Sequence, residues 1–213
     1  PTITNLAGDS LAYNEGDGAV VIEQGGNAAV SDVDSTDFST GTLTVSFTAG
    51  SDSAEDVLSI RNQGTGAGQI GVSGSNVTYE GTLIGTFTGG SSGSNLVVTF
   101  NSNATPTAVT ALVQNITYEN TDTAAPTIGA RTVRFVLTDG DGGTSANYDT
   151  TVTVTAVNDE PTLTATWTNP TYTEDGSAVD LFSTVTVSTV EAGQTLTRLD
   201  FTVTNVTDGT AEA

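Results

Sequence analysis

The chain has 213 residues, of which 36% are hydrophobic, 25 are acidic and four are basic, giving a net charge of −21. All four bases are arginine, and the chain contains no cysteine and no histidine. This charge excludes nucleic acids and anionic membrane surfaces as partners, because both are bound through Lys and Arg. Disulfides, thiolate chemistry and the commonest transition-metal ligands are excluded as well, so any bound metal must accept oxygen ligands.

The composition also excludes two broad functional classes. No run of 18 apolar residues is present, so direct membrane insertion is not expected. Catalysis is not expected either, because without His, Cys and Lys only paired carboxylates remain, and acids in solvated turns lack the burial that tunes a catalytic pKa. Dense acid without base indicates either a solubilising surface or ligands for divalent cations. The acids cluster in turns, which favours cations.

The first half of the chain is predicted to consist of short strands separated by polar turns. Residues 1–12 are expected to form the first strand, Tyr13–Gly18 a turn and Ala19–Ile22 a second strand. Residues 43–47 alternate strictly, which places Leu43, Val45 and Phe47 on one buried face. Further strands are expected at residues 57–60, 70–72, 77–79, 84–87 and 96–100.

Residues 105–114 interrupt the strand pattern. Thr105 suits a helix N-cap and Pro106 the first helical position, while Val109, Leu112 and Ile116 recur at helical spacing. We therefore predict one short helix here. Strands then resume at residues 116–118, 133–137 and 148–154.

The start of the chain is repeated about one domain later. Pro161–Thr164 repeats the pattern of Pro1–Thr4, and the polar turn before Pro161 closes the preceding strand. We therefore predict a complete domain over 1–160 and the N-terminal part of a second over 161–213. In the second domain, residues 199–203 repeat the alternation of residues 43–47 and are expected to form a strand.

The second domain has too few large side chains to bury a core alone. Its inner face therefore requires a cover, either from the remainder of the same polypeptide or from a strand donated by a neighbouring chain. Trp167, the only tryptophan, is expected to pack inside this core.

Two pairs of aspartates stand in turns between predicted strands. Asp32 and Asp34 precede residues 43–47, and Asp139 and Asp141 follow residues 133–137. Calcium takes six to eight oxygen ligands, so it needs such carboxylates to converge. Any single aspartate in a turn serves mainly solvation, but paired aspartates favour a cation site.

Four motifs together resemble the bacterial cadherin-like repeats of large secreted adhesins. They are Tyr13-Asn14-Glu15, Asp32-Val33-Asp34, the turn at residues 138–143 and the exit motif at residues 157–161. The resemblance implies an all-β fold, a cadherin-like or immunoglobulin-like antiparallel β-sandwich repeat. It also implies Ca²⁺ bound between consecutive domains.

The resemblance further implies a set of calcium ligands. Glu15, Asn158 and Asp159 would serve the junction after the first domain, with Glu119 a looser candidate. Asp32, Asp34 and Asp139 would serve the junction before it. The second domain departs from the pattern, because Thr189 and Glu191 stand where the first has Asp32 and Asp34. Glu191 is its remaining carboxylate ligand.

The resemblance implies a non-catalytic extender repeat of an extracellular or cell-surface fibre, with neighbouring repeats as partners. One alternative is a filament or surface-layer subunit assembled by strand exchange. A second alternative is a carbohydrate-binding module that presents Trp167 and Tyr172 to cell-surface glycans.

Overall fold

The computed structural model describes residues 1–191, 193–202 and 204. These residues form many strands and one helix of eight residues, which confirms the predicted all-β class with one short helix. No helix in the described part of the chain is long and apolar enough to cross a membrane. The chain divides into two compact units, unit 1 over Pro1–Val157 and unit 2 over Asn158–Ala213, whereas the predicted boundary lay after residue 160.

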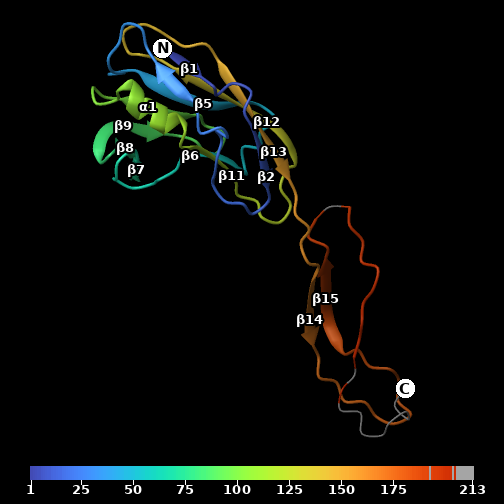
Figure 1. Cartoon of the computed structure of the whole chain (residues 1–213). Helices are drawn as coiled ribbons and strands as arrows, with labels where there is room; N and C mark the ends of the chain where they lie inside the picture. Colours follow the sequence, from blue (N-terminus) through green and yellow to red (C-terminus); the bar gives the residue numbers. More distant parts are fainter. Residues whose placement is uncertain (192, 203, 205–213) are drawn as a thin grey trace. The chain divides into compact units, whose positions relative to one another are not determined.

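Unit 1 is built from three sheets (Figure 1). The largest has eight strands, in the order β2 (Ser10–Asn14), β13 (Tyr148–Thr155), β12 (Gly129–Leu137), β5 (Thr42–Ala49), β10 (Leu96–Phe100), β9 (Thr82–Thr88), β8 (Asn76–Tyr79) and β7 (Ile70–Ser73). The second has three strands, in the order β3 (Val20–Val21), β11 (Ile116–Asn120) and β6 (Asp56–Ile60). The third is the ribbon of β1 (Thr2–Thr4) and β4 (Ala29–Ser31).

Three details differ from the sequence prediction. The expected first strand is divided into β1 and β2, because Asn5 and Gly8 adopt positive φ angles of 56° and 91° and turn the chain between them. Strand β2 then runs through Tyr13, which is buried inside it and not in a turn. The prediction of a wholly antiparallel arrangement is also wrong at one pair, because β2 pairs with β13 in parallel.

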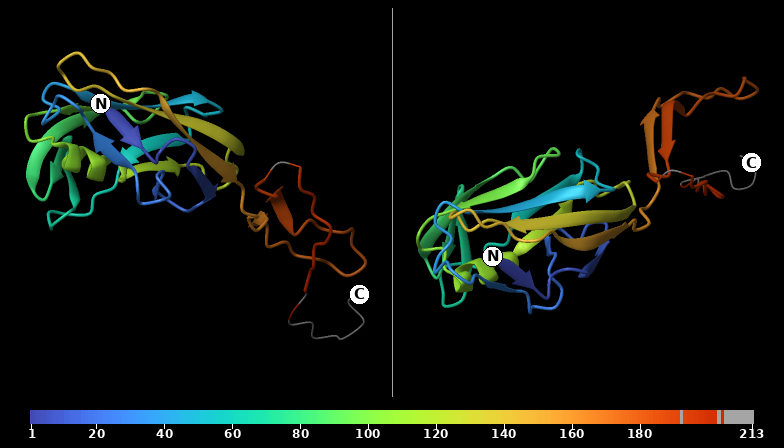
Figure 2. Two further views of the ribbon diagram at one scale, coloured as in Figure 1. Left: turned by 45° about the horizontal axis from the view of Figure 1, so that its top comes forward. Right: turned by 90° about the horizontal axis from the view of Figure 1, so that it is seen from above.

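The core of unit 1 is formed by alternate residues of both larger sheets. Leu43 and Val45 of β5 are fully buried and Phe47 is half-buried, as their spacing predicts. They pack in one apolar cluster with residues of β12, β13, β6 and β11. In the right-hand view of Figure 2, β5 and β12 run along one layer while α1 and β1 lie along the other.

Helix α1 spans Pro106–Val113 and confirms the predicted helix. The Thr105 hydroxyl accepts a hydrogen bond from the Ala108 amide at 3.3 Å, so threonine caps the first turn. The buried residues Ala108, Val109, Leu112 and Val113 lie on the face that packs on β4. The helix is therefore a cover for the β1–β4 ribbon.

We expect Thr105→Ala to lower the free energy of unfolding by about 1 kcal/mol, because it removes the helix cap. Thr107→Ala is the matched control, because Thr107 is exposed inside the same helix and its replacement removes no cap. Urea unfolding of both variants measures the difference. Equal stabilities for the two variants would contradict the capping role.

An ion pair that the sequence analysis did not anticipate lies inside unit 1. Asp56 of β6 accepts hydrogen bonds from Arg131 Nε at 3.2 Å, from the Tyr118 hydroxyl at 2.5 Å and from Asn120 Nδ2 at 3.2 Å. Arg131 also donates to the Gly129 carbonyl and both charged side chains are buried. Burial, and next the Asp56 carboxylate, raise the pKa of Tyr118. The network ties β6, β11 and β12 together.

Unit 2 contains a two-stranded antiparallel ribbon of β14 (Thr162–Trp167) and β15 (Phe182–Ser188). The strand predicted at residues 199–203 is not formed over 199–202, and Val203 lies outside the described residues. Trp167 is exposed and contacts Phe182 edge-on, so the prediction that it lies in a core is wrong for the described chain. The physical reason is that a two-stranded ribbon has no second layer to cover the ring.

Candidate metal centre

Strand pairing brings the predicted acidic turns of unit 1 together. Asp32 and Asp34 follow β4 and precede β5, whereas Asp139 follows β12. Strands β5 and β12 are neighbours with Leu43 opposite Leu137, and the Thr42 and Thr138 amides each donate to the other's carbonyl. The start of one strand and the end of the other therefore meet at one end of the sheet.

Two glycines allow the turns to approach closely. A Cβ on Gly41 would lie 2.2 Å from the Thr138 carbonyl oxygen, and a Cβ on Gly140 would lie 2.0 Å from the Ser39 carbonyl oxygen. Gly140 also has a φ of +89°, which disfavours other residues. The close approach of these backbones determines the distance between the carboxylates that they carry.

Asp32, Asp34 and Asp139 form a triad whose ligand atoms all lie within 4.8 Å of one another. Asp32 Oδ1 accepts hydrogen bonds from the Asp34 and Ser35 amides, both at 3.1 Å. Asp139 Oδ1 accepts from the Asp141 and Gly143 amides, both at 2.9 Å. One oxygen of each of these two carboxylates is thus held by backbone, which fixes the side chain and leaves the second oxygen for a ligand.

The second oxygen of Asp32 indicates that the triad could hold a cation. Asp32 Oδ2 is buried and has no hydrogen-bond partner. The Pro1 ammonium lies 2.8 Å away, an ion-pair distance without hydrogen-bond geometry, and β1 brings it there by pairing with β4. Where a residue precedes Pro1, the same nitrogen is an uncharged amide, so the buried oxygen would then need another cation.

The electrostatics of the triad favour positive charge. The Pro1 ammonium, and next the Asp34 amide, hold the pKa of Asp32 well below its usual range. Asp32 in turn raises the pKa of Asp34, because its carboxylate accepts a hydrogen bond from the protonated form and repels the charged one. A cation would favour the charged form of Asp34, which the neighbouring Asp32 carboxylate disfavours.

The donor set fits a hard divalent ion. It consists only of carboxylate oxygens, with no nitrogen or sulfur ligand, and such sets suit Ca²⁺, Mg²⁺ or Mn²⁺. Asp141 was predicted to join Asp139 in the site, but its carboxylate lies outside the triad and accepts a hydrogen bond from Ser35 Oγ at 3.4 Å. In this turn Asp141 contributes its backbone amide, which donates to Asp139 Oδ1.

We expect Gly143→Ala to weaken divalent-cation binding, because its Cβ would lie 2.1 Å from Asp139 Oδ2 and displace that oxygen. Gly142→Ala is the matched control in the same turn: its Cβ meets nothing within 4 Å, although its φ of +110° adds backbone strain. Calorimetric titration with calcium measures the affinity of both variants. A larger loss of affinity in Gly143→Ala than in Gly142→Ala would indicate displacement of the Asp139 oxygen. Equal loss of affinity in both variants would mean that strain alone is responsible.

The other predicted ligands lie elsewhere in the two units. In unit 1, Glu15 Oε2 accepts from the Val157 amide at 2.8 Å, while its buried Oε1 has no partner. Glu119 lies on β11, where its charge helps to raise the pKa of Tyr13 after the larger effect of burial. Within unit 1 neither glutamate belongs to a triad like that of Asp32.

In unit 2 the predicted ligands Asn158, Asp159 and Glu191 are near one another. The Asp159 amide donates to Glu191 Oε1, and the buried Glu191 Oε2 has no partner. The Asn158 side-chain oxygen accepts from Gln194 Nε2 at 3.0 Å. Glu191 therefore follows the pattern of Asp32, with one oxygen on a backbone amide and one without a partner.

Sequence reasoning missed two contributors to the centre, Pro1 and Gly143. The pairing of β1 with β4 could have predicted the first, because Thr2 opposite Ser31 places the preceding residue beside Asp32. No pattern in the sequence indicates the second. Comparisons of the chain with protein-family models, with curated proteins and with solved structures found no match.

Proposed function

We propose that the chain is a non-catalytic, extracellular repeat of a long adhesin or cell-surface fibre, and that Ca²⁺ bound at the ends of its units stiffens the joints between repeats. In this proposal unit 1 is a cadherin-like β-sandwich and the partners are neighbouring repeats. Support comes from the all-β fold, the lack of His and Cys, and the repetition of Pro1–Thr4 at Pro161–Thr164.

The observation that carries the proposal is the convergence of Asp32, Asp34 and Asp139, with a buried Asp32 oxygen that pairs with a positive charge, the Pro1 ammonium at 2.8 Å. These residues lie beside Pro1, where a preceding repeat would attach. Asp32, Asp34 and Asp139 would hold the ion, and the ion would supply the positive charge that offsets their repulsion. Calcium is the ion proposed because its flexible coordination by carboxylate and carbonyl oxygens suits two facing loops.

The expected energy per site is modest. Extracellular calcium modules bind with dissociation constants of about 10⁻⁴ to 10⁻³ M. A free ion at about ten times that concentration stabilises the bound form by about 1.4 kcal/mol. One joint therefore changes little by itself, but many joints in an array determine whether a fibre is extended or flexible.

For the joint that follows unit 1, the proposal uses Glu15, Asn158 and Asp159. Single-molecule energy transfer tests it on the whole chain, because a protein without cysteine can be labelled specifically after Ser102→Cys and Ser177→Cys, both at exposed sites. Millimolar Ca²⁺ should narrow the distribution of transfer efficiencies, and a chelator should broaden it again.

Glu15→Gln is the variant that connects this result to the carboxylates. It keeps the size of the side chain and the acceptor for the Val157 amide but removes the charge. We expect it to abolish the calcium-dependent narrowing. A distribution that calcium leaves unchanged in the native chain would contradict stiffening, even if the ion binds.

A further inference from the structure

One face of the β14–β15 ribbon is apolar and exposed. Strand register places Leu163 opposite Val187 and Ala165 opposite Val185, so these side chains share one face, named here the ribbon face. A register shift follows, after which Trp167 lies opposite Phe182 and contacts its ring. Leu163 is 51%, Val187 44% and Trp167 60% exposed. A two-stranded ribbon is at best marginally stable alone, and an exposed apolar face of this kind marks an interaction site.

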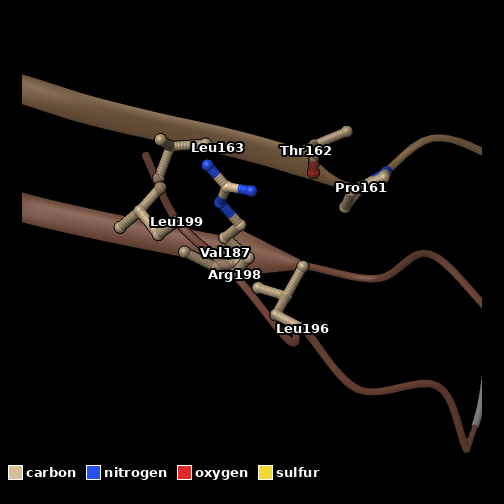
Figure 3. Close-up of a pocket in the computed structure, with 7 residues that line it drawn as sticks. All are labelled: Pro161, Thr162, Leu163, Val187, Leu196, Arg198 and Leu199. Atoms are coloured by element: carbon tan, nitrogen blue, oxygen red, sulfur yellow. The ribbon is translucent and has the colours of Figure 1, made fainter. Parts of the chain in front are cut away.

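The ribbon face is hollowed and not flat. Leu196 and Leu199, from the segment after β15, line a pocket together with Leu163 and Val187 (Figure 3). Phe201 continues this row and lies 6.5 Å from Phe182 between ring centroids. Leu199 and Phe201 are 60% and 71% exposed, so this segment extends the apolar surface without covering it.

Unit 1 contains the same ribbon in a buried state. Strands β1 and β4 pair Thr2 with Ser31 and Ile3 with Val30, and β14 and β15 pair the corresponding residues, Thr162 with Ser188 and Leu163 with Val187. The sequence around these pairs is also repeated, since Pro1–Thr4 matches Pro161–Thr164. Yet Ile3 and Val30 are only 2% and 7% exposed.

A single stretch of unit 1, residues 105–157, supplies the groups that cover its ribbon. Helix α1 packs on β4, and Thr110 Oγ1 accepts a hydrogen bond from the Val30 amide at 2.8 Å. Gln114 Nε2 donates to the Ala28 carbonyl at 2.7 Å. From β13, the Tyr148 hydroxyl accepts from the Ile3 amide at 3.0 Å. The cover thus provides an apolar helix face and polar side chains for the ribbon backbone.

We propose that the ribbon face of unit 2 is a docking surface for a polypeptide segment built like residues 105–157, an amphipathic helix followed by alternating strands. The helix occupies the surface over Val187, as α1 does over Val30 of β4. This interaction requires no metal ion, so it stands independently of the calcium proposal.

The test adds residues 105–157 as a separate polypeptide to the whole chain. Trp167 is the only tryptophan of the chain and the added segment has none, so its fluorescence reports on the ribbon face alone. We expect a saturable blue shift and reduced quenching by acrylamide. Leu163→Ser should abolish the shift, whereas Leu83→Ser, which changes an exposed leucine of unit 1, should leave it intact.

Three outcomes would overturn the proposal. The first is no change in fluorescence at any concentration of the segment. The second is a blue shift that grows with the concentration of the chain alone and accompanies a doubled mass, which would make a second copy the occupant. The third is a shift with oligosaccharides but not with the segment.

Thermal unfolding of unit 1 in the Leu163→Ser and Val187→Ser variants verifies that either substitution acts only on unit 2.

Discussion

Arg131→Met should lower the free energy of unfolding of unit 1 by about 3 to 5 kcal/mol, because it leaves the buried Asp56 carboxylate without its positive partner. Asp56 would keep the Tyr118 hydroxyl and the Asn120 amide as donors, but neither carries a charge. Methionine matches the length of the aliphatic part of arginine, so lost packing contributes little. Chemical unfolding followed by far-UV circular dichroism measures the change.

Arg134→Met is the matched control. Arg134 is on the same strand and pairs with Asp149 at 2.7 Å, but both side chains are about one-third or more exposed. Exposed pairs contribute about 1 kcal/mol or less. The double variant Arg131→Met with Asp56→Leu should regain only part of the lost stability, because it removes the unpaired charge but also the acceptor of the Tyr118 hydroxyl. Equal effects of Arg131→Met and Arg134→Met would show that the buried pair has no special role.

Asp34→Asn should have opposite effects on the protein with and without a divalent ion. The hydrogen bond from protonated Asp34 to Asp32, and next the repulsion between their charges, raise the pKa of Asp34. Without the ion the variant should raise the melting temperature, because asparagine removes the charge and keeps a donor for Asp32. With calcium it should weaken binding by about tenfold or more, because the site loses a charged ligand. Calorimetric melting in chelator and in millimolar Ca²⁺ gives both comparisons.

The pH dependence provides a second readout of the same repulsion. The folded pKa of Asp34 is above its ordinary value of 3.8. Between pH 3.8 and this raised pKa, the folded state therefore binds more protons than the unfolded chain does. In chelator, the contribution of Asp34 to the stability of the native protein should therefore fall as pH rises from 3.8 through the raised pKa, and the comparison with Asp34→Asn isolates it. Asp34→Asn should remove this slope. Asp141 lies outside the triad, so Asp141→Asn is the control, and its melting temperature should still be higher in calcium than in chelator.

Much of the fold follows from local patterns. Helix α1 could be predicted because Thr105 and Pro106 are a cap and a first-turn residue, and β5 because Leu43 and Val45 alternate. The parallel pairing of β2 with β13 could not, because residues about 140 positions apart leave no local trace. Residues 199–202 show the limit of alternation, since a strand also needs a neighbour with which to form hydrogen bonds.

The buried ion pair could have been predicted from the parity of its strands. On β12, Arg131 alternates in step with Val133 and Phe135, whose side chains face the core. On β6, Asp56 alternates in step with the buried Leu58. A charge at an inward position requires an opposite charge nearby.

The candidate metal centre was predicted in part. The convergence of Asp32 and Asp34 with Asp139 follows from the resemblance to cadherin-like repeats and is confirmed as a triad that could hold a metal ion. Asp141 is not a member of this triad, and its carboxylate instead accepts a hydrogen bond from Ser35 of the neighbouring loop, so its role as a ligand stays a prediction. The burial of Asp32 Oδ2 could not be predicted, since burial at a loop depends on how β1 and β4 pack.

Equilibrium dialysis of the whole chain against radioactive Ca²⁺ tests the central claim most directly, because it counts bound ions. We predict saturable binding in the range of about 10⁻⁴ to 10⁻³ M, one ion fewer in Asp139→Asn, and tighter binding after acetylation of Pro1 removes its ammonium from Asp32. A chain that binds no calcium, or that binds the same number of ions after Asp139→Asn, would contradict the assignment of the triad as the calcium site.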